Sequence, residues 1–188
     1  TVFWIVGITN SINLVDGIDG LASGLILLSC VTLSFVYLER DMVEASFLTV
    51  ILTGSVFGFF IFNFPPAKII LGDTGSLSLG LLISLITLIP LSQKFTDEIY
   101  YLIPIITLLI PIIDTTSAFF RRVLKGTSPF SKDAKHLHHR LAKLGFSPSK
   151  TIFILFIICF YFNLTVLLTV YNIDLIPNFI PIYFLFVI

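Results

Sequence analysis

The stretch ASFLTVILTGSVFGFFIFNFPPA, residues 45–67, carries no charged side chain and is rich in Phe, Ile, Leu and Val. An apolar stretch of about 20 residues is long enough to cross a bilayer as an α-helix. Four further stretches have a similar length and character, the last of them interrupted only by Asp114: 21–38, 74–93, 151–173 and 99–120. The sequence therefore predicts five complete membrane-spanning helices.

The composition excludes a water-soluble protein. Of the 188 residues 56% are hydrophobic and 12% are charged, and the mean hydropathy is +1.04. Soluble domains carry about 25% charged residues, and disordered chains combine low hydrophobicity with high net charge. Eleven basic residues balance eleven acidic ones, so nothing indicates a nucleic-acid partner. The two cysteines lie far apart in apolar stretches, which supports neither a disulfide framework nor a thiolate metal site.

The two ends of the chain are also apolar. Residues 1–8 are too few to cross a bilayer, and residues 175–188 are still apolar where the sequence stops. We expect both to be cut helices, and residues 1–188 to be a single integral membrane domain from the middle of a larger protein. The predicted fold class is all-α, a polytopic transmembrane helix bundle.

The basic residues predict which way the bundle faces. Alternating crossings place residues 9–20, 63–74 and 121–150 on one side of the membrane. That side carries nine Lys and Arg residues, and the other carries two, Arg40 and Lys94. Basic loops face the cytoplasm. We therefore expect a multi-pass protein of the cell membrane with its functional loops on the cytoplasmic side, where the nine basic residues are Lys68, Arg121, Arg122, Lys125, Lys132, Lys135, Arg140, Lys143 and Lys150.

The first of these segments, TNSINLVDGIDGLA at residues 9–22, has amide and carboxylate side chains at a spacing of three: Asn10, Asn13, Asp16 and Asp19. On an ideal helix each such step drifts by about 60°, so the last three could share a face while Asn10 turns away. A helix cap rich in Asn and Asp is the alternative interpretation. Two carboxylates without a basic neighbour at an apolar boundary favour a bound cation or another functional partner.

The second segment, FNFPPAKIILGDTGS at residues 62–76, contains Asn63, Lys68 and Asp73. Its prolines prevent the preceding helix from simply continuing. Asp73 is followed by hydroxyl side chains at the start of the next span, and a helix start favours phosphate. A carboxylate repels phosphate unless Mg²⁺ bridges the two, and an ordinary N-cap is the alternative interpretation.

The third segment, residues 121–150, holds all three histidines of the chain: His136, His138 and His139. A closed zinc site is disfavoured because the three cannot share one helical face. Together with Arg140 they could bind phosphate, or the segment could be a solvated basic connection. Asp114, inside the preceding span, needs a partner, and Arg121 and Arg122 are the basic residues that follow it two turns later.

These motifs together resemble a known family. Asn-x-x-Asn-x-x-Asp-Gly-Ile-Asp-Gly-Leu-Ala, Gly-Asp-Thr-Gly-Ser and His-Leu-His-His-Arg-Leu occur in this order on one predicted membrane face. The set resembles the polyprenyl-phosphate N-acetylhexosamine-1-phosphate transferases, and the histidine motif resembles the branch that transfers GlcNAc-1-phosphate. The match extends from Asn10 to Leu141.

The resemblance implies a phosphotransferase that uses Mg²⁺, with Mn²⁺ as a substitute, to react a UDP-N-acetylhexosamine with undecaprenyl phosphate and release UMP. Asp73 would bind the metal with Asn13 as a further oxygen ligand, and Asp16, Asp19, Asp73 and His138 would be the catalytic residues. Asn63 would lie near the nucleotide, and the histidine motif would hold the diphosphate or sugar. The expected substrate-binding residues are Asn10, Asn63, Lys68, Arg121, His136, His139 and Arg140.

One departure from the family pattern is visible. The family has an adjacent aspartate pair before the first motif, and this chain has none; we attribute its absence to truncation. A cation transporter with carboxylates near helix ends is the main alternative, and a lipid-embedded assembly subunit without chemistry is another. The sequence leaves open which N-acetylhexosamine is used, whether the product serves teichoic acid, lipopolysaccharide or another envelope polysaccharide, and whether the protein forms a homodimer.

Overall fold

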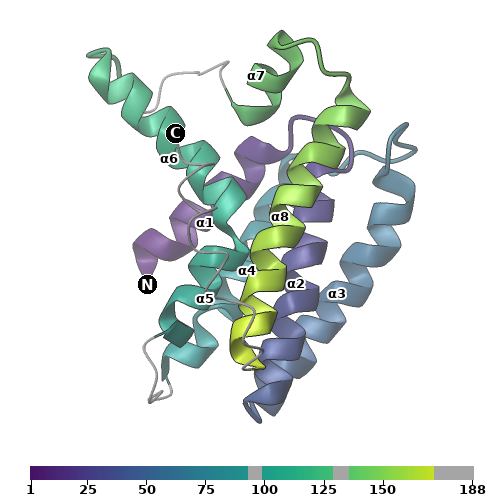
Figure 1. Cartoon of the computed structure of the whole chain (residues 1–188), viewed down its shortest axis with the longest axis vertical. Coiled ribbons are helices and arrows are strands. Elements are labelled where there is room, and N and C mark those ends of the chain that lie inside the picture. Colours follow the sequence, from purple (N-terminus) through teal and green to yellow (C-terminus); the bar gives the residue numbers. More distant parts are fainter. Residues whose placement is uncertain (93–98, 129–135, 172–188) are drawn as a thin grey trace.

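The computed structural model describes residues 1–92, 99–128 and 136–171, and in these ranges it consists of helices without strands (Figure 1). This confirms the predicted all-α class. The predicted apolar end segment 175–188 and the basic residues Lys94, Lys132 and Lys135 lie outside the described residues. The helices are α1 (Val2–Val15), α2 (Leu21–Glu39), α3 (Val43–Asn63), α4 (Gly72–Ile86), the 3₁₀ turn η1 (Ile89–Ser92), α5 (Ile99–Thr107), α6 (Leu109–Leu124), α7 (Leu137–Lys143) and α8 (Pro148–Val170).

Three of the five predicted spans are continuous helices. Helices α2, α3 and α8 have 19, 21 and 23 residues and are apolar enough to cross a membrane. The prediction of a full span over 74–93 was wrong, because α4 has 15 residues and is followed by the turn η1. At about 1.5 Å per residue, α4 is about 22 Å long, shorter than the roughly 30 Å of a hydrocarbon core.

The fifth predicted span is broken rather than continuous. Helices α5 and α6 meet at Leu108 with a bend of 78°. Pro111 has no backbone N–H to donate to the carbonyl of Thr107, four residues earlier. That carbonyl is buried and accepts a hydrogen bond of 2.8 Å from Ser29 Oγ of α2 instead. The bend therefore has an identifiable cause, a missing helix bond whose acceptor is satisfied by a neighbouring helix.

The core forms where α2 lies between α3 and α8, while α1 packs against α4 and α6. Helix α1 approaches α4 closely at Gly80, where a Cβ atom would lie 2.7 Å from the Cα of Thr9. Small residues permit such close crossings of apolar helices. At the far end of the same pair, Trp4 Nε1 donates to Thr87 Oγ1 of the segment after α4 at 2.9 Å. The short helix α4 is thus held along its length by α1.

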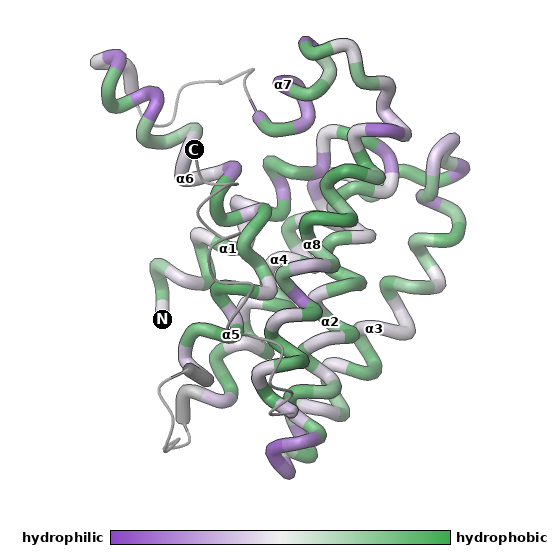
Figure 2. Tube along the Cα trace, viewed as in Figure 1, coloured by the Kyte–Doolittle hydropathy of each residue, from purple (hydrophilic) through white to green (hydrophobic). Residues whose placement is uncertain are grey.

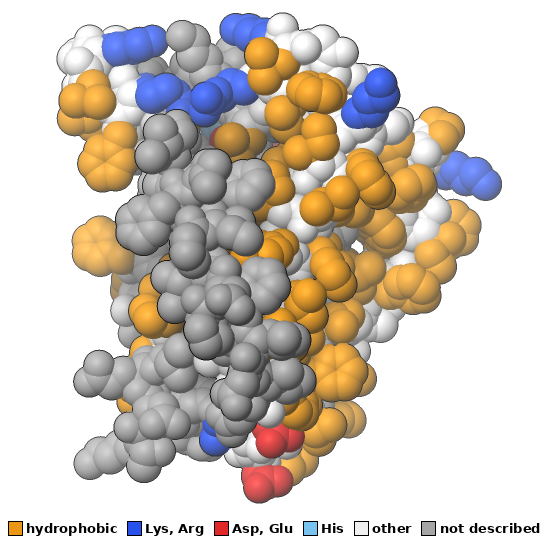
Figure 3. Space-filling model, in the orientation of Figure 1, with side chains coloured by type: hydrophobic (Ala, Val, Ile, Leu, Met, Phe, Trp, Pro, Cys, Tyr) orange, Lys and Arg blue, Asp and Glu red, His pale blue; other side chains and the backbone are white. Residues whose placement is uncertain are grey.

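The most hydrophilic residues gather mainly at the two ends of the bundle (Figure 2). The visible face carries Lys and Arg side chains mainly at the end where α7 lies, and the red acidic side chains lie at the opposite end (Figure 3). We call the first the basic end. It comprises the turn between α1 and α2 (residues 16–20), the connection between α3 and α4 (residues 64–71), and α7.

Candidate active site

Asn13, in the last turn of α1, joins the first and second sequence motifs. Its Nδ2 donates to Asp73 Oδ1 at 3.0 Å and to Ser76 Oγ at 2.9 Å, both in the first turns of α4. Helix α1 ends at Val15, so Asn13 is helical while Asp16 and Asp19 lie in the turn that follows. The close packing of α1 on α4 brings together residues that are 60 positions apart.

Asp16 shares this site with the other two carboxylates. The pKa of Asp16 is raised from 3.8 to about 6, mainly by burial and also by the negative charges of Asp73 and Asp19, while a backbone hydrogen bond from Gly72 lowers it. Charges raise the pKa of a carboxyl in this way only when they lie nearby, so Asp73 and Asp19 lie near Asp16. The separate connections therefore converge, as the motifs predicted.

A second set of contacts fixes the turn against the connection 64–71. Asn63 Oδ1 accepts from Gly20 N at 3.0 Å and from Ser23 Oγ at 2.7 Å, and its Nδ2 donates to the Ile69 carbonyl at 2.9 Å. Asp19 Oδ2 accepts from Ala67 N at 3.3 Å. Gly20 adopts a φ of +77° and lies against the connection, where a Cβ would be 3.1 Å from Pro65 Cδ, so glycine is required there.

These contacts correct the expectation for Asn63. We expected this residue to lie near a nucleotide, but its side chain is 2% exposed and its amide is used by three groups of the protein. A buried amide with satisfied donors and acceptors holds structure together rather than presenting atoms to a ligand. Asn63 therefore positions the two loops that carry Asp16, Asp19 and Asp73.

The donor set fits a hard divalent cation. Asp73 is exposed, and carboxylate and amide oxygens are the ligands that Mg²⁺ accepts while it keeps water or phosphate in its other positions. The repulsion that raises the pKa of Asp16 would be relieved by a cation between the carboxylates. In the ranges that the structure describes, no group of three or more His, Cys, Asp or Glu side chains is arranged so that it could hold a metal ion by itself.

The histidine motif reaches the same turn from α7. The His138 ring lies directly against Gly17, where a Cβ would be 2.6 Å from His138 Cε1. The pKa of His138 is lowered to about 4, mainly by burial and also by the neighbouring His139 and His136, while Asp114 opposes the shift. His138 is therefore neutral near pH 7. Its Nδ1 is buried without a hydrogen-bond partner among the described residues.

Asp114 has a different partner from the one that the sequence suggested. In the described part of the chain its carboxylate accepts from Leu137 N at 2.7 Å and contacts His136 Nδ1 at 3.0 Å, rather than forming the ion pair with Arg121 or Arg122 that was one of two open interpretations. Arg121 instead donates from Nη1 to Ser117 Oγ at 3.0 Å. A lone acid in an apolar span was a signal that a partner exists, but the sequence did not say that the partner lies 22 residues away in the histidine motif.

The remaining predicted residues differ in exposure. His136 and His138 are 6% and 4% exposed, whereas His139 and Arg140 are exposed. His136 is buried against Asp114, so its Nδ1 is occupied by a contact within the protein. Asn10 and Lys68 are also exposed, and the described residues give neither side chain a hydrogen bond to the carboxylates.

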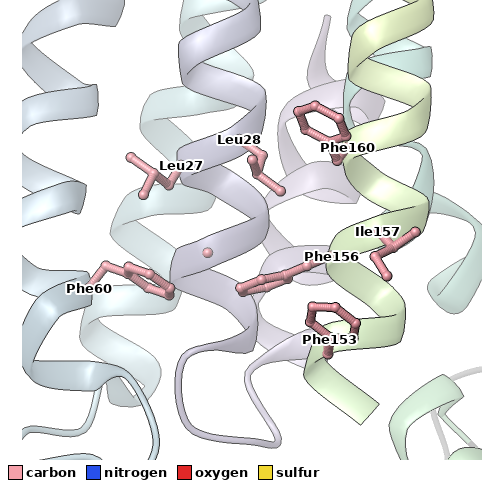
Figure 4. Close-up of a pocket in the computed structure, with 8 residues that line it drawn as sticks. Leu27, Leu28, Phe60, Phe153, Phe156, Ile157 and Phe160 are labelled. Carbon is pink, nitrogen blue, oxygen red and sulfur yellow. The ribbon is translucent and has the colours of Figure 1, made fainter. Parts of the chain in front are cut away.

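Two apolar hollows lie between the helices. The larger one, with a volume of about 600 Å³, lies between α6, α7 and α8; its lining includes Ile113, Phe120, Leu141, Ile154, Phe162 and Arg140. The smaller one, of about 350 Å³, lies between α2, α3 and α8 beside Gly24, where Phe60, Phe153, Phe156 and Phe160 surround it (Figure 4). The larger hollow combines an apolar wall with a guanidinium from the histidine motif.

Comparison with known proteins bears on the family to which the chain is similar. Residues 1–91 match the model of glycosyl transferase family 4. The chain is 43% identical over 88% of its length to the probable undecaprenyl-phosphate N-acetylglucosaminyl 1-phosphate transferase of Bacillus subtilis, and 35% identical over 81% to the decaprenyl-phosphate N-acetylglucosaminephosphotransferase of Mycobacterium leprae. The resemblance to the polyprenyl-phosphate N-acetylhexosamine-1-phosphate transferases is confirmed.

The matched part of each relative is limited. The chain spans about half the length of these relatives, 46% of the Bacillus protein and 43% of the Mycobacterium protein. Half of the chain also matches the phospho-N-acetylmuramoyl-pentapeptide-transferase of Streptococcus uberis, with 45% identity over 94 residues and 28% of that relative covered. The names of the Bacillus and Mycobacterium relatives describe transfer of an N-acetylglucosamine phosphate to a polyprenyl phosphate, and that of the Streptococcus relative describes transfer of phospho-N-acetylmuramoyl-pentapeptide.

Proposed function

We propose that the protein of which this chain is a part transfers a GlcNAc-1-phosphate-type group from a UDP-N-acetylhexosamine to undecaprenyl phosphate and releases UMP, as a step of envelope polysaccharide synthesis. The observation that carries this proposal is the convergence of Asn13, Asp16 and Asp73 at the basic end of a membrane bundle. Both substrates are anions, and one has a long apolar tail. A carboxylate site for a divalent cation at the membrane surface meets both requirements.

The net reaction exchanges one phosphorus–oxygen bond for another. An oxygen of the acceptor phosphate becomes bonded to the β-phosphorus of the sugar nucleotide, and the bond from that phosphorus to the oxygen shared with the α-phosphate breaks, so that UMP leaves. Such transfers depend on positioning and charge stabilisation more than on covalent chemistry by the protein. His139 and Arg140, both exposed at the basic end, supply hydrogen-bond donors for phosphate oxygens.

The proposed cofactor is Mg²⁺, which Mn²⁺ could replace. Asp73 would hold it, and Asn13 would either hold it through its amide oxygen or keep Asp73 in place through the hydrogen bond at 3.0 Å. When bound, the ion would neutralise charge on the transferring phosphoryl group. The hydrogen bonds of Asn63 and Asp19 keep the two loops at the spacing that this requires.

The hollow between α6, α7 and α8 suits the acceptor. The hollow has a volume of about 600 Å³ and a mostly apolar lining, to which Arg140 contributes a charged group. An isoprenoid tail would remain in this apolar groove while Arg140 pairs with the phosphate, since guanidinium groups bind phosphate in a bidentate manner. The proposed orientation places this end of the bundle on the cytoplasmic side of the cell membrane, where sugar nucleotides are available.

The cation-transporter alternative receives less support. In residues 1–92, 99–128 and 136–171 the acidic residues other than Asp114 lie at helix ends or in connections. Asp114 is already bonded to His136 and Leu137. A pathway for ions would need unsatisfied polar groups at successive depths of the membrane, as proton relays and pumps have.

The test uses the full-length protein in membranes with undecaprenyl phosphate, Mg²⁺ and a panel of UDP-sugars, followed by identification of the lipid product. We expect UMP release to depend on Mg²⁺ and Asp73→Asn to abolish it, because the amide removes the charge that would hold the ion. The matched control is Asp41→Asn at the opposite end, an exposed position with a φ of +54° that asparagine tolerates. Turnover by Asp73→Asn close to that of the control would remove the proposed role of Asp73.

A further inference from the structure

Asp114 is the acid that α6 carries within its apolar part, and it is 2% exposed. An ionised carboxylate in such a place is costly unless donors satisfy it. Both of its oxygens are used: Oδ1 accepts the backbone N–H of Leu137 at 2.7 Å, and Oδ2 faces His136 Nδ1 at 3.0 Å. One side chain of α6 therefore holds two consecutive residues at the beginning of α7.

The pair also determines which nitrogen of His136 carries a proton. An ionised carboxylate can only accept, so Nδ1 of His136 is the donor in this contact. The orientation is passed on to His138, because the two rings are stacked with an interplanar angle of 7° and centroids 6.0 Å apart. The His138 ring in turn lies against Gly17, next to Asp16.

A continuous series of contacts thus runs from the apolar part of α6 to the carboxylate site. It begins at Asp114, continues through His136 and His138, and ends at the turn between α1 and α2. The exposed side chains His139 and Arg140 follow directly on the same short helix. Displacement of the start of α7 would move His138 away from the turn and shift His139 and Arg140 with it.

We propose that Asp114 is a positioning residue of the proposed transfer reaction: by holding His136 and the first residue of α7, it places His138 against the turn at Gly17 and keeps His139 and Arg140 at the substrate side. The inference rests on the proposed function and deepens it. His136 becomes a positioning residue rather than a ligand of the substrate. The hydrogen-bond partners that orient a functional histidine are commonly worth a factor of 10 to 100 in activity.

The first test does not depend on activity. Diethyl pyrocarbonate modifies accessible histidines. Trypsin cleaves after Lys135 and Arg140 and so releases all three histidines in the single peptide 136–140. Fragmentation of this peptide in a mass spectrometer shows which histidine carries the label. In the wild-type full-length protein we expect His139 to react fastest, because His136 and His138 are 6% and 4% exposed. Asp114→Ala should raise the rates at these two positions towards that of His139. An unchanged labelling pattern in Asp114→Ala overturns the proposal.

The second test separates positioning from mere folding. We expect Asp114→Ala to raise the KM for the UDP-sugar and to lower kcat/KM by about 10- to 100-fold. The changes in Asp114→Ala, His136→Ala and the double variant should be non-additive, since both residues belong to one contact. The control is Thr115→Val, which keeps the shape of the side chain. The hydroxyl of Thr115 is buried and has no hydrogen-bond partner among the described residues, so this variant should keep the wild-type KM.

The outcomes are distinguishable. A fall in kcat in proportion to the folded fraction, with an unchanged KM, means that Asp114 is only structural and overturns the proposal. Additive effects of Asp114→Ala and His136→Ala overturn it as well. If the wild-type protein uses no UDP-sugar while labelling of His136 and His138 still increases in Asp114→Ala, the proposed function fails and the holding contact of Asp114 stands.

Discussion

Replacing Gly17 by alanine adds one methyl group at a place that the His138 ring already occupies. A Cβ on Gly17 would lie 2.6 Å from His138 Cε1 and closer still to Nε2. Comfortable contacts between carbon atoms are about 3.5–4.0 Å, so the ring must retreat by about 1 Å. Gly17 is not among the residues with positive φ, so alanine suits the backbone and the collision is the main effect.

The expected size follows from the cost of overpacking. Inserting a methyl group into a packed site costs about 1–3 kcal/mol, and about 1.4 kcal/mol corresponds to a factor of ten in rate. If the ring retreats from the site in order to avoid the collision, kcat/KM for the UDP-sugar should fall by about 5- to 150-fold. The assay is Mg²⁺-dependent UMP release by the full-length protein, together with its thermal unfolding midpoint in detergent.

A double-mutant cycle isolates the contact. In Gly17→Ala/His138→Ala the methyl group has no ring to displace, so the double variant should match His138→Ala in both activity and unfolding midpoint. The control Gly58→Ala introduces the same methyl group in α3, where nothing lies within 4 Å of the added atom, and should leave activity unchanged. Additive effects in the cycle, or wild-type activity of Gly17→Ala, would refute the contact between α7 and the turn.

Two further predictions concern stability. Asn63→Ala removes the hydrogen-bond partner of Gly20 N, Ser23 Oγ and the Ile69 carbonyl, and it should lower the unfolding free energy by about 2–4 kcal/mol. The measurement is the shift of the thermal unfolding midpoint, and the control is Asn10→Ala at an exposed position. The second prediction concerns pH: the pKa of His138 is about 4 in the folded protein and about 6.5 in the unfolded protein. The unfolded state therefore binds the proton more readily. The unfolding free energy should fall as the pH falls from about 6.5 to 4, by at most about 3 kcal/mol. His138→Gln should lack this component of the pH dependence, and identical pH profiles would contradict the assigned burial.

The number and length of apolar stretches predicted a membrane bundle correctly, but not where its helices end. Residues 99–120 contain enough apolar side chains for one span, and a count of hydrophobic residues cannot show that the helix bends at Leu108. The bend depends on whether another group can satisfy the carbonyl that Pro111 leaves free. Ser29 of α2 does so at 2.8 Å, and this contact joins residues 78 positions apart.

The motifs indicated which residues should gather, but not the role of each. Asn13 and Asp73 were expected together, and the structure joins them at 3.0 Å. Asn63 belongs to the same motifs, yet it is buried and bonded to backbone and Ser23. A motif records that a residue type is needed, whereas exposure and hydrogen bonding decide whether it contacts a ligand or supports one that does.

By itself the sequence determined the all-α membrane class, the family resemblance and the set of polar residues in three segments, since apolar length and local motifs are properties of contiguous residues. The tertiary structure alone decided that Asp114 pairs with His136, that His138 lies against Gly17, and that burial and the nearby Asp73 and Asp19 raise the pKa of Asp16. These features depend on distances between segments far apart in the chain, and such distances arise only when the helices pack.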